Sequence, residues 1–154
     1  MQVHHNAKEA LDKLVNDSEC ITALLISREG VSIEESGNTG YLNTTALAAL
    51  IAGMFTATRE VARMVGEEHF SILLQQGTNR HIHISLINET VMMVIIFEDY
   101  QRIGKVRYEA KKASEVIANI MQPEPEASVE KLNVAGFREY ALNLIDRIFD
   151  KPQG

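Results

Sequence analysis

The sequence predicts an α+β sandwich, in which a five-stranded antiparallel sheet of order 2-1-5-4-3 carries one long helix on one face and two helices on the other. Segments 21–26 and 91–97 are apolar on both alternating faces, which is typical of strands covered on both sides. Segment 43–66 is the longest stretch with one uninterrupted helical period. Placing the two apolar strands side by side, with a hairpin on one side and a meander on the other, gives this order.

The first part of the chain predicts a helix followed by a β-hairpin. Residues 6–16 form an amphipathic helix, and Asn6 and Glu9 are spaced as in a capping box. Its inward face is apolar: Ala7, Ala10, Leu11, Leu14 and Val15. A turn at 28–30 then joins the first buried strand to segment 31–35, which alternates apolar with polar residues and carries charge. This second strand therefore belongs at an edge of the sheet.

The helix predicted over 43–66 has two distinct faces. Asn43 or Thr44 can cap its start, and Gly66 suits the left-handed residue just past its end. The face expected to pack on the sheet consists of Leu47, Leu50, Ile51, Met54, Thr58, Val61, Ala62 and Val65. The other face is small and weakly polar: Ala49, Gly53, Thr56, Ala57 and Glu60. Because small residues let another backbone approach closely, this second face predicts contact with a partner.

The second half of the sheet is predicted as a meander of three strands. Segments 70–75, 81–86 and 91–97 are separated by short polar turns, and segment 81–86 alternates strictly. The central helix must then cross one face of the sheet from edge to edge. A helix over 105–121 joins the first helix on the other face, with its apolar stripe at Val106, Ala110, Ala113, Ile117 and Ile120.

The composition changes after the last of these helices. We predict a domain over 4–121, an acidic and proline-containing linker over 122–128, an amphipathic helix over 129–150 and a short tail over 151–154. The sandwich is closed without this C-terminal helix. The helix therefore either packs back on its own subunit or serves as a separate contact element.

Charge and cysteine content exclude several classes of protein. The net charge of −6 leaves no basic excess for neutralising phosphates, so we expect no nucleic-acid partner. Cys20 is the only cysteine, so no intrachain disulfide can form, and a reducing compartment is the simplest expectation. No apolar run approaches the roughly 20 residues of a membrane span, and the polar start is not a signal peptide. The sequence therefore predicts a cytoplasmic protein without a membrane span.

Few residues are arranged for chemistry. No phosphate-binding glycine loop and no nucleophile elbow occur, so we predict a protein that is not an enzyme and holds no cofactor. His81 and His83 share one face of a strand, but no carboxylate or cysteine is placed nearby in sequence, so we predict no metal site. Cys20 beside an apolar strand indicates a buried small residue rather than a nucleophile. A small-ligand sensor is disfavoured because no polar cluster is expected in the core.

Four basic residues lie early in the last helix of the domain: Lys105, Arg107, Lys111 and Lys112. They predict a solvated face, with an acidic partner as the alternative.

Five segments, in this order and spacing, carry a resemblance to a known family: ALLISREGVSIE, LNTTALAALIAG, MVGEEHF, VIIF and GKVRYEAKKASEVI. They resemble the bacterial branch of the Roadblock (dynein light chain) family, over about 11–121. The resemblance implies a homodimer whose third strands pair edge to edge through Ile72, Leu73 and Leu74, with the central helices side by side. It also implies that a small Ras-like GTPase docks on the surface that these helices form.

Carried over residue by residue, that platform comprises Ala49, Gly53, Thr56, Ala57, Glu60, Arg63 and Met64. Arg59 and Glu60 stand where the family pattern has small residues. The resemblance implies a regulator that stimulates GTP hydrolysis without an arginine finger, in cell polarity or gliding motility, so Arg59 and Arg63 are expected to be contact residues. The alternative is a non-catalytic scaffold that holds a GTPase or another signalling partner without changing turnover.

Overall fold

The computed structural model describes residues 2–121 and 142–143, with side chains from Asn6 onward, and the chain divides into two units, 1–121 and 122–154. In the first unit the elements follow in this order: α1 (Gln2–Ser18), β1 (Thr22–Ser27), β2 (Ser32–Gly37), α2 (Thr44–Met64), β3 (Ile72–Gln76), β4 (His81–Leu86), β5 (Val91–Phe97), a short 3-10 helix η1 (Tyr100–Arg102) and α3 (Ile103–Ile120). The predicted linker over 122–128, helix over 129–150 and tail over 151–154 lie outside the described residues, apart from residues 142 and 143, which are helical.

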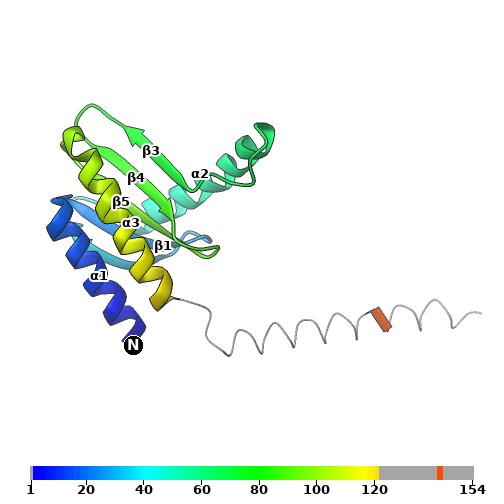
Figure 1. The fold of residues 1–154 in the computed structure, drawn as a ribbon, viewed down its shortest axis with the longest axis horizontal. Coiled ribbons are helices and arrows are strands. Elements are labelled where there is room, and N and C mark those ends of the chain that lie inside the picture. The colour runs from blue at the N-terminus through cyan, green and yellow to red at the C-terminus, as the bar shows by residue number, and fades with distance from the viewer. Residues whose placement is uncertain (1, 122–141, 144–154) are drawn as a thin grey trace, which may run out of the picture. The chain divides into compact units, whose positions relative to one another are not determined.

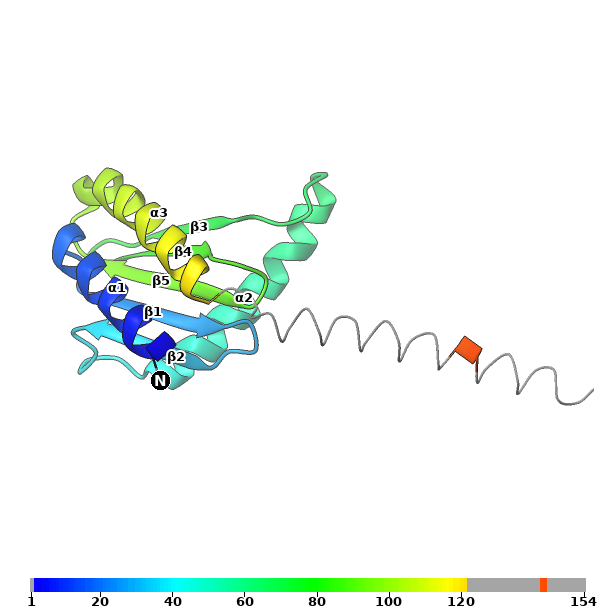
Figure 2. The ribbon, with the colours of Figure 1, turned by 60° about the horizontal axis from the view of Figure 1, so that its bottom comes forward.

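The five strands form one antiparallel sheet of order β2-β1-β5-β4-β3, which confirms the predicted topology. Helices α1 and α3 lie side by side on one face, and α2 lies on the other (Figures 1 and 2). Strands β1 and β5 are covered on both faces, as their continuous apolar sequences predicted. In the register, Leu24 pairs with Val94, and Val94 in turn pairs with Ile84. The centre of the sheet is therefore its most apolar part.

Two hydrophobic cores lie on opposite faces of the sheet because strand side chains alternate. The core under α1 and α3 contains Leu11, Leu14, Leu25, Met93, Ile95, Phe97, Val106 and Ile117. The core under α2 contains Leu24, Ile26, Ile51, Phe55, Ile84, Met92, Val94 and Ile96.

The first helix begins earlier than its sequence predicted. Because α1 starts at Gln2, Asn6 lies inside the helix, and the predicted capping box of Asn6 and Glu9 is wrong. The inward stripe is placed correctly, since Ala7, Leu11 and Leu14 are buried. At α2 the predicted cap is correct, because the side chain of Asn43 accepts a hydrogen bond from the backbone N–H of Ala46 at 3.1 Å.

Helix α2 is rotated about its axis relative to the predicted orientation. Its buried residues are Ala48, Ile51, Ala52, Phe55 and Ala62. Of the face expected to pack on the sheet, Leu50, Val61 and Val65 are exposed instead. The physical reason is that the helix has two apolar stripes, and the one containing the bulky Phe55 fills the space above β1 and β5. Its C-terminal turns extend past the sheet (Figures 1 and 2).

The end of the β1–β2 hairpin requires a glycine. Gly37 has φ of +82°, and a Cβ atom at this position would collide with the backbone carbonyl oxygen of Ile21. Only glycine meets both conditions without strain.

Candidate interaction surface on helix α2 and strand β3

The surface of α2 that faces away from the sheet is exposed along its whole length. Seven residues that the sequence assigned to the platform all lie there: Ala49, Gly53, Thr56, Ala57, Glu60, Arg63 and Met64. We call these residues, together with Leu50, Val61 and Val65, the outer face of α2. A Cβ atom added at Gly53 would meet nothing within 4 Å, so this part of the helix is open to a neighbouring molecule.

The outer face is more apolar than its sequence suggested. Leu50 is 72% exposed and Met64 87% exposed, and Val61 and Val65 are also more than half exposed. Apart from Met64, these residues were missed as surface residues because their helical period placed them in the core. Large apolar side chains grouped on one helix face form a patch of the kind that is common at interaction sites.

The polar groups of the outer face are largely satisfied within the helix. The hydroxyl of Thr56 donates to the carbonyl oxygen of Ala52 at 3.0 Å, and Arg63 forms an exposed ion pair with Glu60 at 2.9 Å. Arg59 is half-buried and makes no ion pair within residues 6–121. The outer face therefore presents apolar groups and a charge pair that is neutralised locally.

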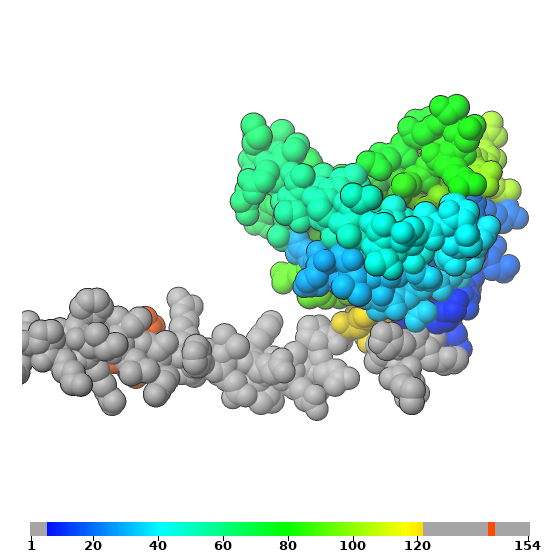
Figure 3. All heavy atoms as spheres, turned by 180° about the vertical axis from the view of Figure 1, so that it is seen from behind, coloured from blue at the N-terminus to red at the C-terminus, as the bar shows by residue number. Residues whose placement is uncertain are grey.

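Figure 3 shows this side of the first unit from the direction of α2. The surface is hollowed between the C-terminal end of α2 and the segment that carries β3. The side-chain amide of Gln75 on β3 contacts the sulfur of Met54 on α2 at 3.0 Å, which ties the strand to the helix.

Strand β3 lies at one edge of the sheet, as predicted. Ile72 is about half exposed, and Leu73 and Leu74 are half-buried on opposite faces, Leu73 toward the core under α2 and Leu74 toward the other core. No residue of β3 is charged. The backbone N–H and C=O groups of this edge are therefore available for pairing, and no charged side chain of β3 would repel a second strand.

The opposite edge, β2, is tied to α1. The ammonium of Lys8 donates to the carbonyl oxygen of Glu35 at 2.9 Å, and Ser36 donates to the carboxylate of Asp12, which holds the pKa of Asp12 below its usual value. The pairing register of β1 and β2 is interrupted between Leu25 and Ile26. The two edges of the sheet are thus built differently.

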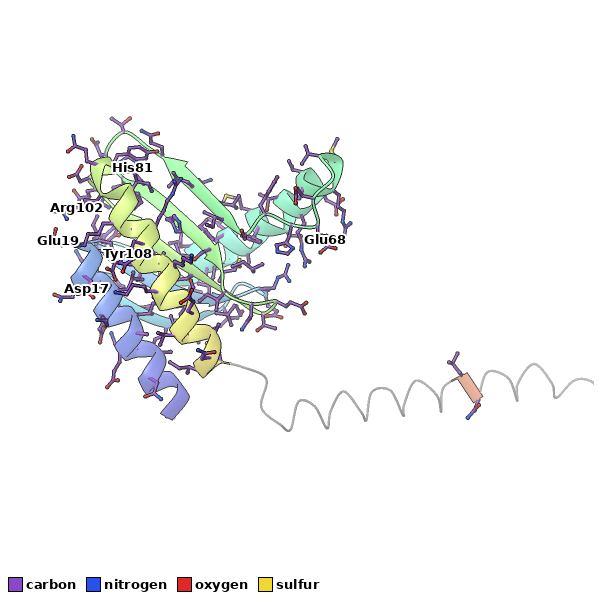
Figure 4. The ribbon with its side chains drawn as sticks, in the orientation of Figure 1. Asp17, Glu19, Glu68, His81, Arg102 and Tyr108 are labelled. Atoms are coloured by element: carbon purple, nitrogen blue, oxygen red, sulfur yellow. The ribbon has the colours of Figure 1, made fainter. Side chains whose placement is uncertain are left out.

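The two histidines of β4 have different environments. Nδ1 of His81 accepts a hydrogen bond from the backbone N–H of Gly77 at 3.2 Å, and its ring packs against Phe97 and Tyr100 near the start of α3 (Figure 4). His83 is buried, and neither ring nitrogen has a hydrogen-bond partner among the described residues. The expectation that no polar cluster occurs in the core is wrong, because His81, His83 and Ser85 are all buried on one face of β4.

Other residues considered for chemistry have structural surroundings. Cys20 is buried, its sulfur lies 3.7 Å from the carbonyl oxygen of Thr22, and burial raises the pKa of the thiol. Lys112 pairs with Glu109 at 3.6 Å and lies over the ring of Tyr108. Across the part of the chain that the structure describes, no group of three or more His, Cys, Asp or Glu side chains could hold a metal ion. Within the same residues, no helix is long and apolar enough to cross a bilayer.

A five-stranded sheet of this order, with one helix on one face and two on the other, defines a small α/β/α module with an exposed apolar face on its single helix. A family model described as the Roadblock/LC7 domain matches residues 6–97, more than half of the chain. The chain belongs to the Roadblock/LC7 family. A search of curated proteins finds no match.

Solved structures similar to this one include bacterial MglB proteins. Myxococcus xanthus MglB is 28% identical with a TM-score of 0.75, over 77% of this chain and 90% of that chain. The gliding protein MglB of Thermus thermophilus is 28% identical with a TM-score of 0.74, over 78% of this chain and 91% of that chain. A third structure, described as MglB with a tetrameric arrangement, is 26% identical with a TM-score of 0.73, over 78% of this chain and 90% of that chain.

Proposed function

We propose that this protein is a homodimeric regulator of a small Ras-like GTPase and that the outer face of α2 is its contact surface. The observation that carries the proposal is the group of exposed apolar side chains on that face, on a Roadblock/LC7 fold similar to MglB. The sequence motifs also resemble those of MglB, which regulates the GTPase MglA. The proposed partners are therefore a second copy of the chain and a GTPase of the MglA type.

Both halves of the proposed surface favour self-association physically. Full burial of a leucine, valine or methionine side chain contributes about 1.5–3 kcal/mol, and four such side chains on the outer face are more than half exposed. Two β3 edges can exchange backbone hydrogen bonds without bringing like charges together. Pairing at β3 would also bring two α2 helices together, because both elements border the hollow in Figure 3.

The regulator is proposed to act by contact, without supplying a catalytic arginine. The guanidinium of Arg63 is already paired with Glu60, and Arg59 is half-buried. Each would have to leave its present surroundings to reach a phosphate on a bound GTPase. Activation through reshaping of the GTPase, as the MglB resemblance implies, needs only a surface of fixed shape. An apolar platform on a packed helix provides such a surface.

Thr56→Arg tests the contact surface. The new side chain would project from the outer face, where it should block the GTPase through steric overlap and the cost of burying a charge. We expect loss of complex formation and of stimulated GTP hydrolysis in single-turnover assays with an MglA-type GTPase, while the melting temperature shifts by only a few degrees. Thr90→Arg is the matched control, because Thr90 is exposed in the turn between β4 and β5.

Light scattering on the same samples measures whether the protein is a monomer or a dimer. The wild type should have a mass of twice 17.2 kDa at micromolar concentration, and a monomer would contradict the proposal. If the wild type binds the GTP form without accelerating hydrolysis, the protein is a scaffold instead. If Arg59→Ala removes acceleration but not binding, an arginine finger operates after all.

A further inference from the structure

A cavity of about 300 Å³ opens between the outer strands of the sheet and α3, on the face opposite to α2. It is lined by Ser71, Ile72, His83, Ser85, Leu86, Arg107, Ala110 and Lys111. Cavities that hold small molecules begin at about this size and combine apolar walls with a few convergent polar groups. This one has both, and nothing in the proposed GTPase contact uses it.

The buried polar groups of the cavity wall lack partners. His83 is 1% exposed and Ser85 is 7% exposed, yet both ring nitrogens of His83 and the hydroxyl of Ser85 make no hydrogen bond within residues 6–121. His81, two residues earlier on the same face of β4, has its Nδ1 satisfied by Gly77. Buried polar side chains are normally hydrogen-bonded, so the unsatisfied groups of His83 and Ser85 point to a partner in the cavity.

The charge that borders the cavity is positive. Arg107 and Lys111 lie one turn apart on α3 and form no ion pair with any described residue, whereas the neighbouring Lys112 pairs with Glu109. No carboxylate lines the cavity. Burial, with the charge of Arg107, lowers the pKa of His83, so its neutral ring offers one N–H donor. Two cations and three neutral donors thus surround one space in a protein of net charge −6.

We propose that this cavity binds a small phosphate monoester that has an apolar body. An arginine fork, an ammonium group, the hydroxyls of Ser71 and Ser85 and the imidazole N–H supply more donors than a carboxylate with two oxygens can accept, and a phosphate has three terminal oxygens. The apolar body lies against Ile72 and Ala110. No residue of the outer face of α2 lines this site, so it does not depend on the proposed GTPase contact, although Ile72 also belongs to the β3 edge of the proposed dimer.

The test is a titration of the full-length protein with phenyl phosphate, followed by NMR of the histidine rings and arginine side chains. We expect saturable shifts at His83 and Arg107, with His81 unchanged. Lys111→Gln should weaken binding by about tenfold, because one charge-assisted hydrogen bond is lost. Lys105→Gln is the matched control, since Lys105 is exposed on the same helix outside the cavity, and its affinity should stay within about twofold.

Other probes separate the alternatives. Inorganic phosphate should bind more weakly at the same residues, and benzyl alcohol, which has the body without the charge, should not bind. Equal binding of benzyl alcohol, an equal effect of both lysine variants, or no shift at His83 would each overturn the proposal. Binding only to phosphatidic acid vesicles, without phenyl phosphate, would also overturn it in favour of a membrane lipid. No GTPase is present in these experiments, so their failure is distinct from failure of the proposed regulation.

Discussion

Two separate substitutions, Phe55→Ala and Leu50→Ala, test which face of α2 packs on the sheet. Phe55 is 2% exposed and belongs to the core with Leu24, Val94 and Ile96. Leu50 is five residues earlier on the same helix, but it is 72% exposed. The two substitutions therefore remove apolar side chains of similar size from opposite sides of one helix.

The expected costs differ severalfold. Removing a buried phenylalanine side chain costs about 3–5 kcal/mol, because contacts are lost and a cavity remains. Leu50 keeps only a little over a quarter of its surface covered in the monomer, so its truncation should cost below about 1 kcal/mol. Since domains of this size are stable by about 5–15 kcal/mol, the first variant should be markedly destabilised and the second nearly normal.

Urea unfolding followed by circular dichroism, at a high and a very low protein concentration, measures both effects. Phe55→Ala should lower the unfolding free energy at both concentrations. Leu50→Ala should have its larger effect at the high concentration, where a dimer would bury this side chain. If Leu50→Ala is as costly as Phe55→Ala at the lowest concentration, the orientation of α2 described above is wrong.

Three further predictions concern stability, each measured by urea or thermal unfolding. Single truncations to alanine on the doubly covered strands should each cost about 2–5 kcal/mol, and losses below about 1 kcal/mol at every site would contradict the core at Leu24, Ile26, Val94 and Ile96. Because His83 has a pKa below its ordinary value of 6.5, the unfolded chain binds the extra proton, and stability should fall as the pH drops below 6.5, by at most about 1.4 kcal/mol per pH unit. His83→Phe should flatten this dependence, and an unchanged slope would show that other groups cause it. Gly37→Ala should cost more than about 1 kcal/mol, because of its positive φ and its contact with Ile21, whereas Gly40→Ala should be nearly neutral; equal effects would refute the strain.

The sheet could be predicted because its strands carry their own burial pattern. The runs containing Leu24 and Val94 are apolar on both faces, and only a central position covers both faces. The charged residues Glu34 and Glu35 exclude such a position for the second strand. Because consecutive strands were expected to pair with each other, few other strand orders of the sheet were possible.

The orientation of α2 could not be predicted from its periodicity. Leu50 and Val61 share a helical period with the buried Ile51, and the sequence does not state which of these apolar side chains meet the sheet. A helix that contacts both a core and a partner has no polar face to distinguish them. The structure shows which of these side chains are buried, and the exposed ones support the proposed interaction surface.

The cavity beside β4 had no signature in the sequence either. His83 and Ser85 are two residues apart on one strand, but Arg107 and Lys111 come from a helix after another strand and turn. The packing of α3 against the sheet places these residues together, and no spacing along the chain encodes that proximity.

The difference between the two edges of the sheet has a consequence for the proposed dimer. At β2 the carbonyl oxygen of Glu35 already accepts a hydrogen bond from the ammonium of Lys8. This strand is also charged, and its pairing register with β1 is interrupted. At β3 the edge is uncharged and unoccupied by any described residue. If two copies join through β3, the only edges left on the combined sheet are the two β2 strands, and strand addition stops there. In the proposed dimer, pairing through β3 would therefore form a closed pair rather than a filament.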